Sequence, residues 1–179
     1  MRKPLLIYVV IVGLIAVTLA CIRGDASQLN VSNVEKENAV SEALIRQRVE
    51  DWAKAVRAKD IDTVLSLYAP ASVSFDMDPP LRYTGAENKR RAWREFFAIH
   101  TGSVRYELHE MDVTANGELA FVHSLNHVSG KLASGHDQDM WLRWTACFRR
   151  IDGVWLVVHD HISVPADLAH GKAATDLKP

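Results

Sequence analysis

The sequence has few cysteines and prolines and no excess of charge of either sign. Its 179 residues include two cysteines, six prolines and nine glycines, which excludes a disulfide framework and a collagen-like chain. Twenty-one Lys and Arg residues oppose 22 Asp and Glu residues, for a net charge of −1. Nucleic-acid-binding domains are usually basic, so no nucleic-acid partner is expected. With 48% hydrophobic residues, the chain is typical of one globular domain with an appendage.

The N-terminus has the parts of an export signal. Met1-Arg2-Lys3 is a basic flank, and residues 4–20 are largely apolar, which predicts that the rest of the chain is exported. At ~17 to 20 residues the apolar run is also long enough for a retained membrane anchor. Cys21 follows Thr18-Leu19-Ala20, a phrase that resembles a bacterial lipobox. Residues 1–23 are therefore a signal peptide, a lipoprotein signal or a membrane anchor, which predicts a protein of the cell envelope that is membrane-anchored, or periplasmic or extracellular.

The remaining chain divides into a polar linker over residues 24–39, a domain over 40–167 and a flexible tail over 168–179. Apolar spacing in the domain predicts three helices, over residues 40–58, 61–68 and 86–98. Asp60 can cap the second helix. Alternating residues predict strands, over residues 72–76, 104–113, 119–128, 140–150 and 154–163.

Two turn signals and one phase change organise the predicted strands. Asn116-Gly117 and Asp152-Gly153 predict hairpins, and a change of phase near His109 predicts a bulge. Helices followed by a strand meander indicate an α+β fold, in which three N-terminal helices pack on a curved, mostly antiparallel sheet. Such a cone-shaped barrel leaves a pocket at its open end.

Asp76 is the first candidate for chemistry, because it ends the first predicted strand. Apolar neighbours such as Phe75, Trp93 and Phe97 would disfavour its charged form and adapt it for proton abstraction. The alternative is structural, since an Asp before a turn such as Met77-Asp78-Pro79 commonly caps backbone amides.

The last predicted strand supplies a second candidate set. At a period of two, His159, His161 and Ser163 share a face with Trp155 and Val157. Neighbouring strands can add polar or aromatic residues to this set: Trp141, Arg143, Thr145, His123 and Asn126. A histidine can move protons near neutral pH, and Arg143 can hold a carboxylate or an enolate oxygen. A buried hydrogen-bond network and a dimer contact are the alternatives.

Three other features have simple structural explanations. His159 and His161 with His123 have a spacing seen in metal sites, but the sequence fixes no acidic ligand, so no metal is predicted. The third helix carries basic residues that form a solvated face or, alternatively, contact anionic lipid: Lys89, Arg90, Arg91 and Arg94. Cys147 is expected to be a small core residue.

Several phrases together resemble a known family: Trp52-Ala53 to Asp60, residues 65–70, Val73-Ser74-Phe75-Asp76, residues 85–97 and residues 141–161. They look like the nuclear transport factor 2-like superfamily, and within it the SnoaL-like and ketosteroid-isomerase-like domains, over residues 40–167. The resemblance implies a homodimer and places Asp76 where the isomerases carry their general base. Trp52 takes the place of their phenolic donor, and Arg143 or Thr145 falls near their second acid, so 3-oxosteroid isomerisation is not implied.

Two hypotheses follow. In the first, the domain binds a small apolar molecule and performs cofactor-free acid–base chemistry of isomerase, cyclase or dehydratase type, with Asp76, His161 and Arg143 as catalytic residues. The expected pocket is lined by Trp52, Phe75, Trp93, His123, Asn126, Trp141, Thr145 and His159. In the second, the domain is a non-catalytic binding or oligomerisation module of the cell envelope.

Overall fold

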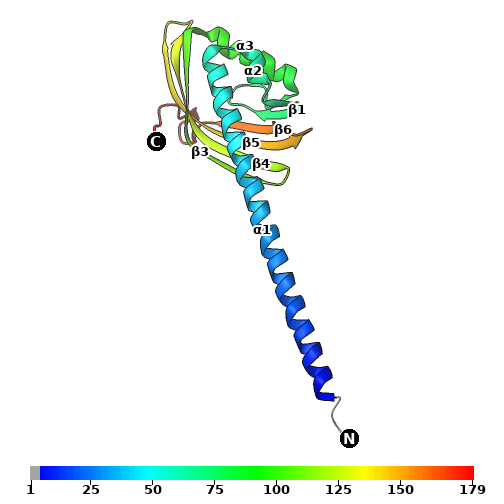
Figure 1. Ribbon diagram of the computed structural model, residues 1–179. Helices are drawn as coiled ribbons and strands as arrows, with labels where there is room; N and C mark the ends of the chain where they lie inside the picture. Colours follow the sequence, from blue (N-terminus) through cyan, green and yellow to red (C-terminus); the bar gives the residue numbers. More distant parts are fainter. Residues whose placement is uncertain (1–4) are drawn as a thin grey trace. The chain divides into compact units, whose positions relative to one another are not determined.

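The computed structural model describes residues 31–179 in full and, for residues 5–30, only that they belong to a helix (Figure 1). The chain divides into two compact units, residues 1–39 and 40–179. Among the described residues, no helix is both long and apolar enough to cross a membrane. The side chains of the expected export signal or anchor, residues 1–23, lie outside that described part, so the signal stays a prediction.

Helix α1 (Leu5–Ala58) ends where the sequence predicts but begins much earlier. Residues 24–39, predicted as a polar linker, are helical throughout, and their part as a linker stays a prediction. Residues 25–39 contain neither Gly nor Pro, the residues that end helices most strongly, so the absence of an apolar stripe did not stop the helix. From Ile45 to Val56 the expected stripe is present and buried.

Helix α2 (Ile61–Leu65) is shorter than predicted. The Asp60 side chain caps it and accepts hydrogen bonds from the backbone N–H and the hydroxyl of Thr63, at 3.2 and 2.6 Å. Strand β1 (Tyr68–Phe75) then begins four residues earlier than expected. The predicted helix through Tyr68 was wrong because pairing with a distant strand outweighs local helical spacing: Tyr68 pairs in parallel with Val157.

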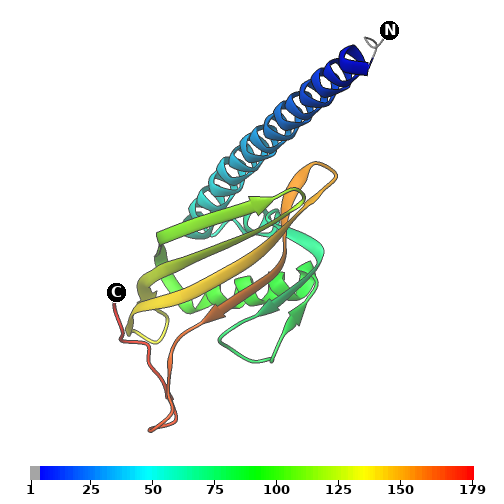
Figure 2. The same ribbon diagram turned by 90° about the horizontal axis from the view of Figure 1, so that it is seen from below.

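Six strands form a curved sheet in the order β2-β1-β6-β5-β4-β3 (Figure 2). The strands after β1 are β2 (Tyr83–Thr84), β3 (His100–Asn116), β4 (Leu119–Leu132), β5 (Asp137–Ile151) and β6 (Val154–Ser163). Every neighbouring pair is antiparallel except β1 and β6. Helix α3 (Ala86–Ile99) crosses the concave face (Figure 2). The α+β fold, both hairpins and the bulge after His109 are confirmed.

A bulge at Val158 decides which face each side chain of β6 occupies. The register with β5 shifts there, so the alternation of side chains reverses beyond it. Val157 is buried before the bulge and Asp160 is buried after it. His159 and His161 therefore lie on the outer face of the sheet. The prediction that they share a face with Val157 was wrong, because no local signal marks the inserted residue.

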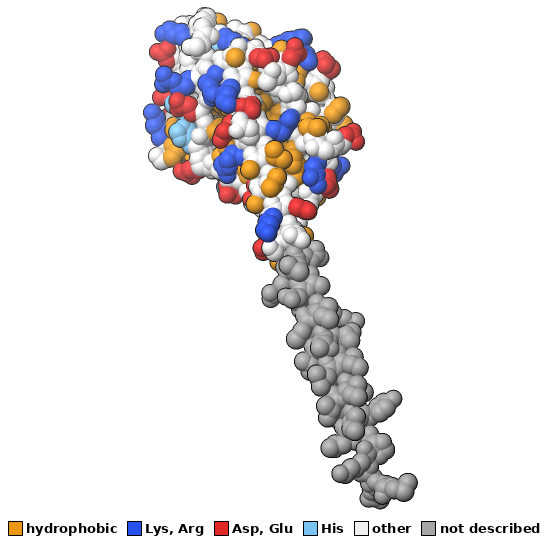
Figure 3. All heavy atoms as spheres, in the orientation of Figure 1, with side chains coloured by type: hydrophobic (Ala, Val, Ile, Leu, Met, Phe, Trp, Pro, Cys, Tyr) orange, Lys and Arg blue, Asp and Glu red, His pale blue; other side chains and the backbone are white. Residues whose placement is uncertain are grey.

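The core lies between the concave face and helices α1 and α3. Trp52 stacks on Trp144 at 5.3 Å between ring centres and meets Trp93 edge-on at 5.6 Å. Cys147, expected in this core, lies on the opposite face and is partly exposed. On the surface seen in Figure 3, acidic and basic side chains are intermixed.

The C-terminal segment, predicted as a flexible tail over residues 168–179, includes a short paired strand. Strands β7 (Ala166–Asp167) and β8 (Lys172–Ala173) pair as a small antiparallel ribbon. Lys178 then lies with its ammonium nitrogen 3.3 Å from a carboxylate oxygen of Asp139 on β5. The tail thus has backbone pairing and one exposed ion pair, a contact that adds little stability.

Candidate functional site

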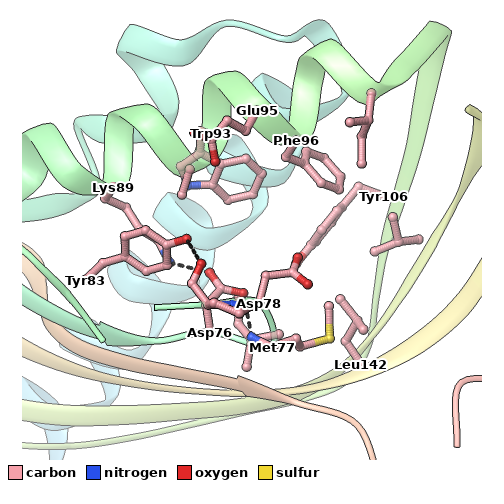
Figure 4. Close-up of a pocket in the computed structure, with 15 residues that line it drawn as sticks. Asp76, Met77, Asp78, Tyr83, Lys89, Trp93, Glu95, Phe96, Tyr106 and Leu142 are labelled. Carbon is pink, nitrogen blue, oxygen red and sulfur yellow. Dashed lines mark hydrogen bonds and ion pairs between the residues drawn. The ribbon is translucent and has the colours of Figure 1, made fainter. Parts of the chain in front are cut away.

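A cavity of about 310 Å³ opens between helix α3 and the concave face of the sheet (Figure 4). Its apolar wall includes Trp93, Phe96, Tyr106, Leu142 and Ile162. Its polar lining comprises Asp76, Asp78, Tyr83, Lys89 and Glu95. In Figure 4, Trp93 and Phe96 descend from the helix, whereas Asp76 and Met77 lie on the sheet side. A concave apolar site with a few polar groups is typical of small-molecule binding.

Asp76 follows strand β1 and lies at the edge of this cavity. Its Oδ1 accepts a hydrogen bond from the backbone N–H of Met77 at 2.9 Å. Its Oδ2 lies 3.4 Å from the ammonium nitrogen of Lys89. One carboxylate oxygen therefore caps the turn, as the structural interpretation of the sequence predicts. The carboxylate also lines the cavity, and its part as a base stays a prediction.

Lys89 is buried and lies between two carboxylates. Its ammonium nitrogen is 3.3 Å from Oδ2 of Asp160 and 5.4 Å from the centre of the Tyr68 ring. Asp160 is fully buried and accepts hydrogen bonds from the hydroxyls of Tyr68, at 3.1 Å, and Ser74 and from the indole N–H of Trp144, at 3.5 Å. A buried charge is tolerated only when it is paired and hydrogen-bonded, and Asp160 meets both conditions.

Two tyrosines on opposite sides of the cavity are held in the neutral form. Burial raises the pKa of Tyr106 well above its ordinary value, and burial together with nearby carboxylates raises the pKa of Tyr83. The Tyr83 hydroxyl donates to the carbonyl oxygen of Pro79 at 3.0 Å. The Tyr106 oxygen accepts from the Asn126 amide at 2.8 Å, and the Ser124 hydroxyl orients that amide. Because the Tyr106 hydroxyl keeps its proton, it can donate a hydrogen bond to an acceptor atom of a ligand, and it does not act as a base.

Comparison with known proteins identifies the family to which this domain belongs. The sequence pattern of the SnoaL-like domain matches residues 45–167. The chain belongs to the SnoaL-like domain family. A crystal structure of an NTF2-like protein of unknown function from Pseudomonas putida KT2440 is 35% identical, with a TM-score of 0.73, and the match covers 79% of this chain and 98% of that one.

More distant structures share the fold of this SnoaL-like domain. A ketosteroid isomerase-like protein from Erwinia carotovora atroseptica SCRI1043 is 20% identical, covers 68% of this chain and 94% of its own, and has a TM-score of 0.60. A candidate scytalone dehydratase from Novosphingobium aromaticivorans DSM 12444 is 13% identical, with coverages of 79% and 95% and a TM-score of 0.65. No curated protein matches the sequence. The predicted family and fold are confirmed.

The SnoaL-like domain brings only part of the predicted site together. Asp76 and Trp93 line the cavity. Trp52 lies in the core against Trp144, and Asn126 is buried behind Tyr106. The other predicted residues lie on the outer face of the sheet: Phe75, His123, Trp141, Arg143, Thr145, His159 and His161. The structure thus does not bring His161 or Arg143 into the cavity with Asp76.

Sequence reasoning missed Lys89, which was assigned to a solvated basic face. The side chain is 2% exposed, so that assignment was wrong. A usable signal was present, because Lys89 precedes Trp93 by four residues and Phe96 by seven, which places all three on one helix face. Arg91 and Arg94 do lie exposed, as expected.

The outer-face histidines are not arranged as a metal site. Nδ1 of His159 is 2.8 Å from the carbonyl oxygen of Val73 and forms a hydrogen bond with it. His123 lies instead beside Asp112 of β3, with 3.7 Å between the imidazole nitrogen and the carboxylate oxygen. Among the residues that the structure describes, no three His, Cys, Asp or Glu side chains are placed to hold a metal ion.

Replacing Lys89 tests the buried ion cluster. We expect Lys89→Met to lower the free energy of unfolding by about 3 kcal/mol, because it leaves the charge of Asp160 buried without a counter-charge. Adding Asp160→Asn should recover part of the loss, since the two effects are coupled. Urea denaturation measures the free energy of unfolding of both variants.

The control is Arg94→Met, an exposed change on the same helix, which should alter the free energy of unfolding by no more than about 0.5 kcal/mol. An equally small effect of Lys89→Met would contradict the cluster.

Proposed function

We propose that the SnoaL-like domain binds a small, largely apolar molecule in the cavity under α3 and moves a proton on it without a cofactor, as isomerases, cyclases and dehydratases of this fold do. The carrying observation is the Asp76 carboxylate at the edge of an aromatic cavity, 3.4 Å from the Lys89 ammonium. A base and a hydrogen-bond donor thus lie beside the same apolar space, which is what proton abstraction next to a carbonyl group requires.

In this reaction the Asp76 carboxylate accepts a proton from the carbon next to a ligand carbonyl. The electron pair of the broken C–H bond passes to the carbonyl oxygen and forms an enolate. Lys89 or the hydroxyl of Tyr106 stabilises that oxygen by donating a hydrogen bond. Asp76 then returns the proton to another atom of the ligand, which completes an isomerisation. His161 and Arg143 have no part in it, because they lie on the outer face.

Hydrogen–deuterium exchange of a ketone tests this proposal without knowledge of the natural substrate. The probe is 2-tetralone in D₂O, whose protons next to the carbonyl exchange through an enolate, followed by proton NMR. The full-length protein should accelerate exchange, and Asp76→Asn should reduce the catalysed rate by about 100-fold or more.

Two matched variants control this experiment. Asp112→Asn makes the same chemical change at an exposed position of β3 and should leave the rate unaltered. His161→Gln should also leave it unaltered, which separates catalysis in the cavity from catalysis by the outer-face histidines. An Asp76→Asn protein that melts normally and exchanges the probe as fast as the parent would refute Asp76 as the base.

A second candidate function is the oligomerisation module, which the apolar residues of the outer face favour. Phe75, Leu119, Phe121 and Val154 are each more than 40% exposed. We propose that a second copy covers this face, as the expected homodimer requires. Sedimentation of the full-length protein at micromolar concentration should then show a dimer that Phe121→Lys dissociates; a parent protein that sediments as a monomer would exclude this assembly. The cell-envelope location rests on residues 1–23 and remains part of the proposal.

A further inference from the structure

The charged groups that line the cavity are mostly acidic. Asp76, Asp78 and Glu95 line it with the ammonium of Lys89 as the one cation among the described lining residues. Lys89 is already shared, since its nitrogen lies 3.4 Å from Asp76 and 3.3 Å from Asp160. Asp78 and Glu95 have no ion-pair partner in the described part of the chain. A ligand in the cavity therefore meets two carboxylates that lack a counter-charge.

These carboxylates act on the same region from two walls. Asp78 belongs to the loop after β1, and Glu95 belongs to helix α3 across the cavity (Figure 4). The hydroxyl of Tyr83 lies near these carboxylates. Burial raises its pKa, Asp76, Glu95 and Asp78 raise it further, and Arg91 lowers it. Burial is the largest cause of this rise in pKa, and each of the three carboxylates acts more strongly on the hydroxyl than Arg91 does, so the charges around Tyr83 favour a positive group at this end of the cavity.

The aromatic wall of the cavity also attracts positively charged groups. Trp93 and Phe96 meet edge-on, with ring centres 5.4 Å apart, and both line the cavity with Tyr106. The face of an aromatic ring carries negative charge density and attracts ammonium groups. Asp78 and Glu95 are exposed where they line the cavity, so salt in the solvent screens part of their attraction for a cation.

We infer that the cavity selects a ligand with a positively charged nitrogen attached to an apolar body, and that it discriminates against carboxylate anions. The inference rests on the proposed ligand-binding function and names the chemical class of the ligand. The ammonium group lies towards Asp78 and Glu95, and the apolar body lies against Trp93 and Phe96. An anionic ligand would instead be repelled by three carboxylates and would have to compete with Asp76 and Asp160 for Lys89.

Three probes with one naphthalene body and different charges test the inference: 2-naphthylmethylammonium, 2-naphthylmethanol and 2-naphthoate. Their dissociation constants for the full-length protein are measured by titration calorimetry at pH 7 and low salt. The cation should bind at least tenfold more tightly than the anion, with the neutral alcohol between them. Raising the salt concentration should narrow the difference, because the discrimination is electrostatic.

Two variants assign the selectivity to the cavity. Asp78→Asn and Glu95→Gln should each weaken binding of the cation several-fold and leave the neutral alcohol unchanged. The control is Glu87→Gln, which removes the same charge from an 85% exposed side chain on the same helix and should change neither probe.

Three other results would overturn the inference, and each can be told apart from the others. If the alcohol binds and the cation binds no more tightly, the charge selectivity is wrong while ligand binding in the cavity stands. If Glu87→Gln weakens the cation as much as Glu95→Gln does, the attraction belongs to the whole surface and the cavity is not selective. If none of the three probes binds, both the selectivity and the proposed binding function fail.

Discussion

A lysine buried between two carboxylates is the constraint on which the rest of this structure depends. Lys89 comes from helix α3, Asp160 from strand β6, and Asp76 from the end of strand β1. Each charge would be costly in the core if its partners moved away, so the cluster fixes the helix against the sheet. Ser74 contributes to the same cluster and pairs with Asp160 in the parallel register of β1 and β6.

The cluster also explains why the cavity is polar at one end and apolar along its wall. Lys89 and Trp93 share one face of α3, so the residue that binds the carboxylates and the residue that provides the aromatic wall enter the cavity from the same helix. Asp160 is saturated by buried donors, whereas Asp76 keeps access to the cavity and is 20% exposed. This difference in surroundings makes Asp160 a structural residue and is the reason we propose Asp76 as the base.

The sequence predicts the elements of this fold better than it predicts their faces. Helix α3, the two hairpins, the bulge after His109 and the span of β6 follow from local patterns, because turn residues and apolar spacing act over a few residues. The faces of His159 and His161 do not, because one inserted residue at Val158 reverses them without a local signal. The end of α2 was missed for a related reason, since the partner of Tyr68 lies about ninety residues away in sequence.

In the candidate site too, local sequence patterns predict some residues, whereas contacts between residues far apart in the sequence were missed. Asp76 was found because its place at a strand end is a local feature and because it matches a family position. Asp160 was not among the candidates, because its partners come from β1, α3 and β5, which no local pattern connects. His161 and Arg143 were predicted from strand alternation together with their chemistry, and the fold places them on the other side of the sheet.

The central claim is that ligand binding and proton transfer occur inside the cone, beside Asp76 and Lys89. A crystal structure of the protein with 2-tetralone bound tests it most directly. We expect the ketone between Trp93 and the sheet, with its oxygen within hydrogen-bond distance of Lys89 or Tyr106 and its reactive carbon facing Asp76. A ketone bound instead on the outer face beside His159 and His161, with nothing bound under α3, would contradict the account.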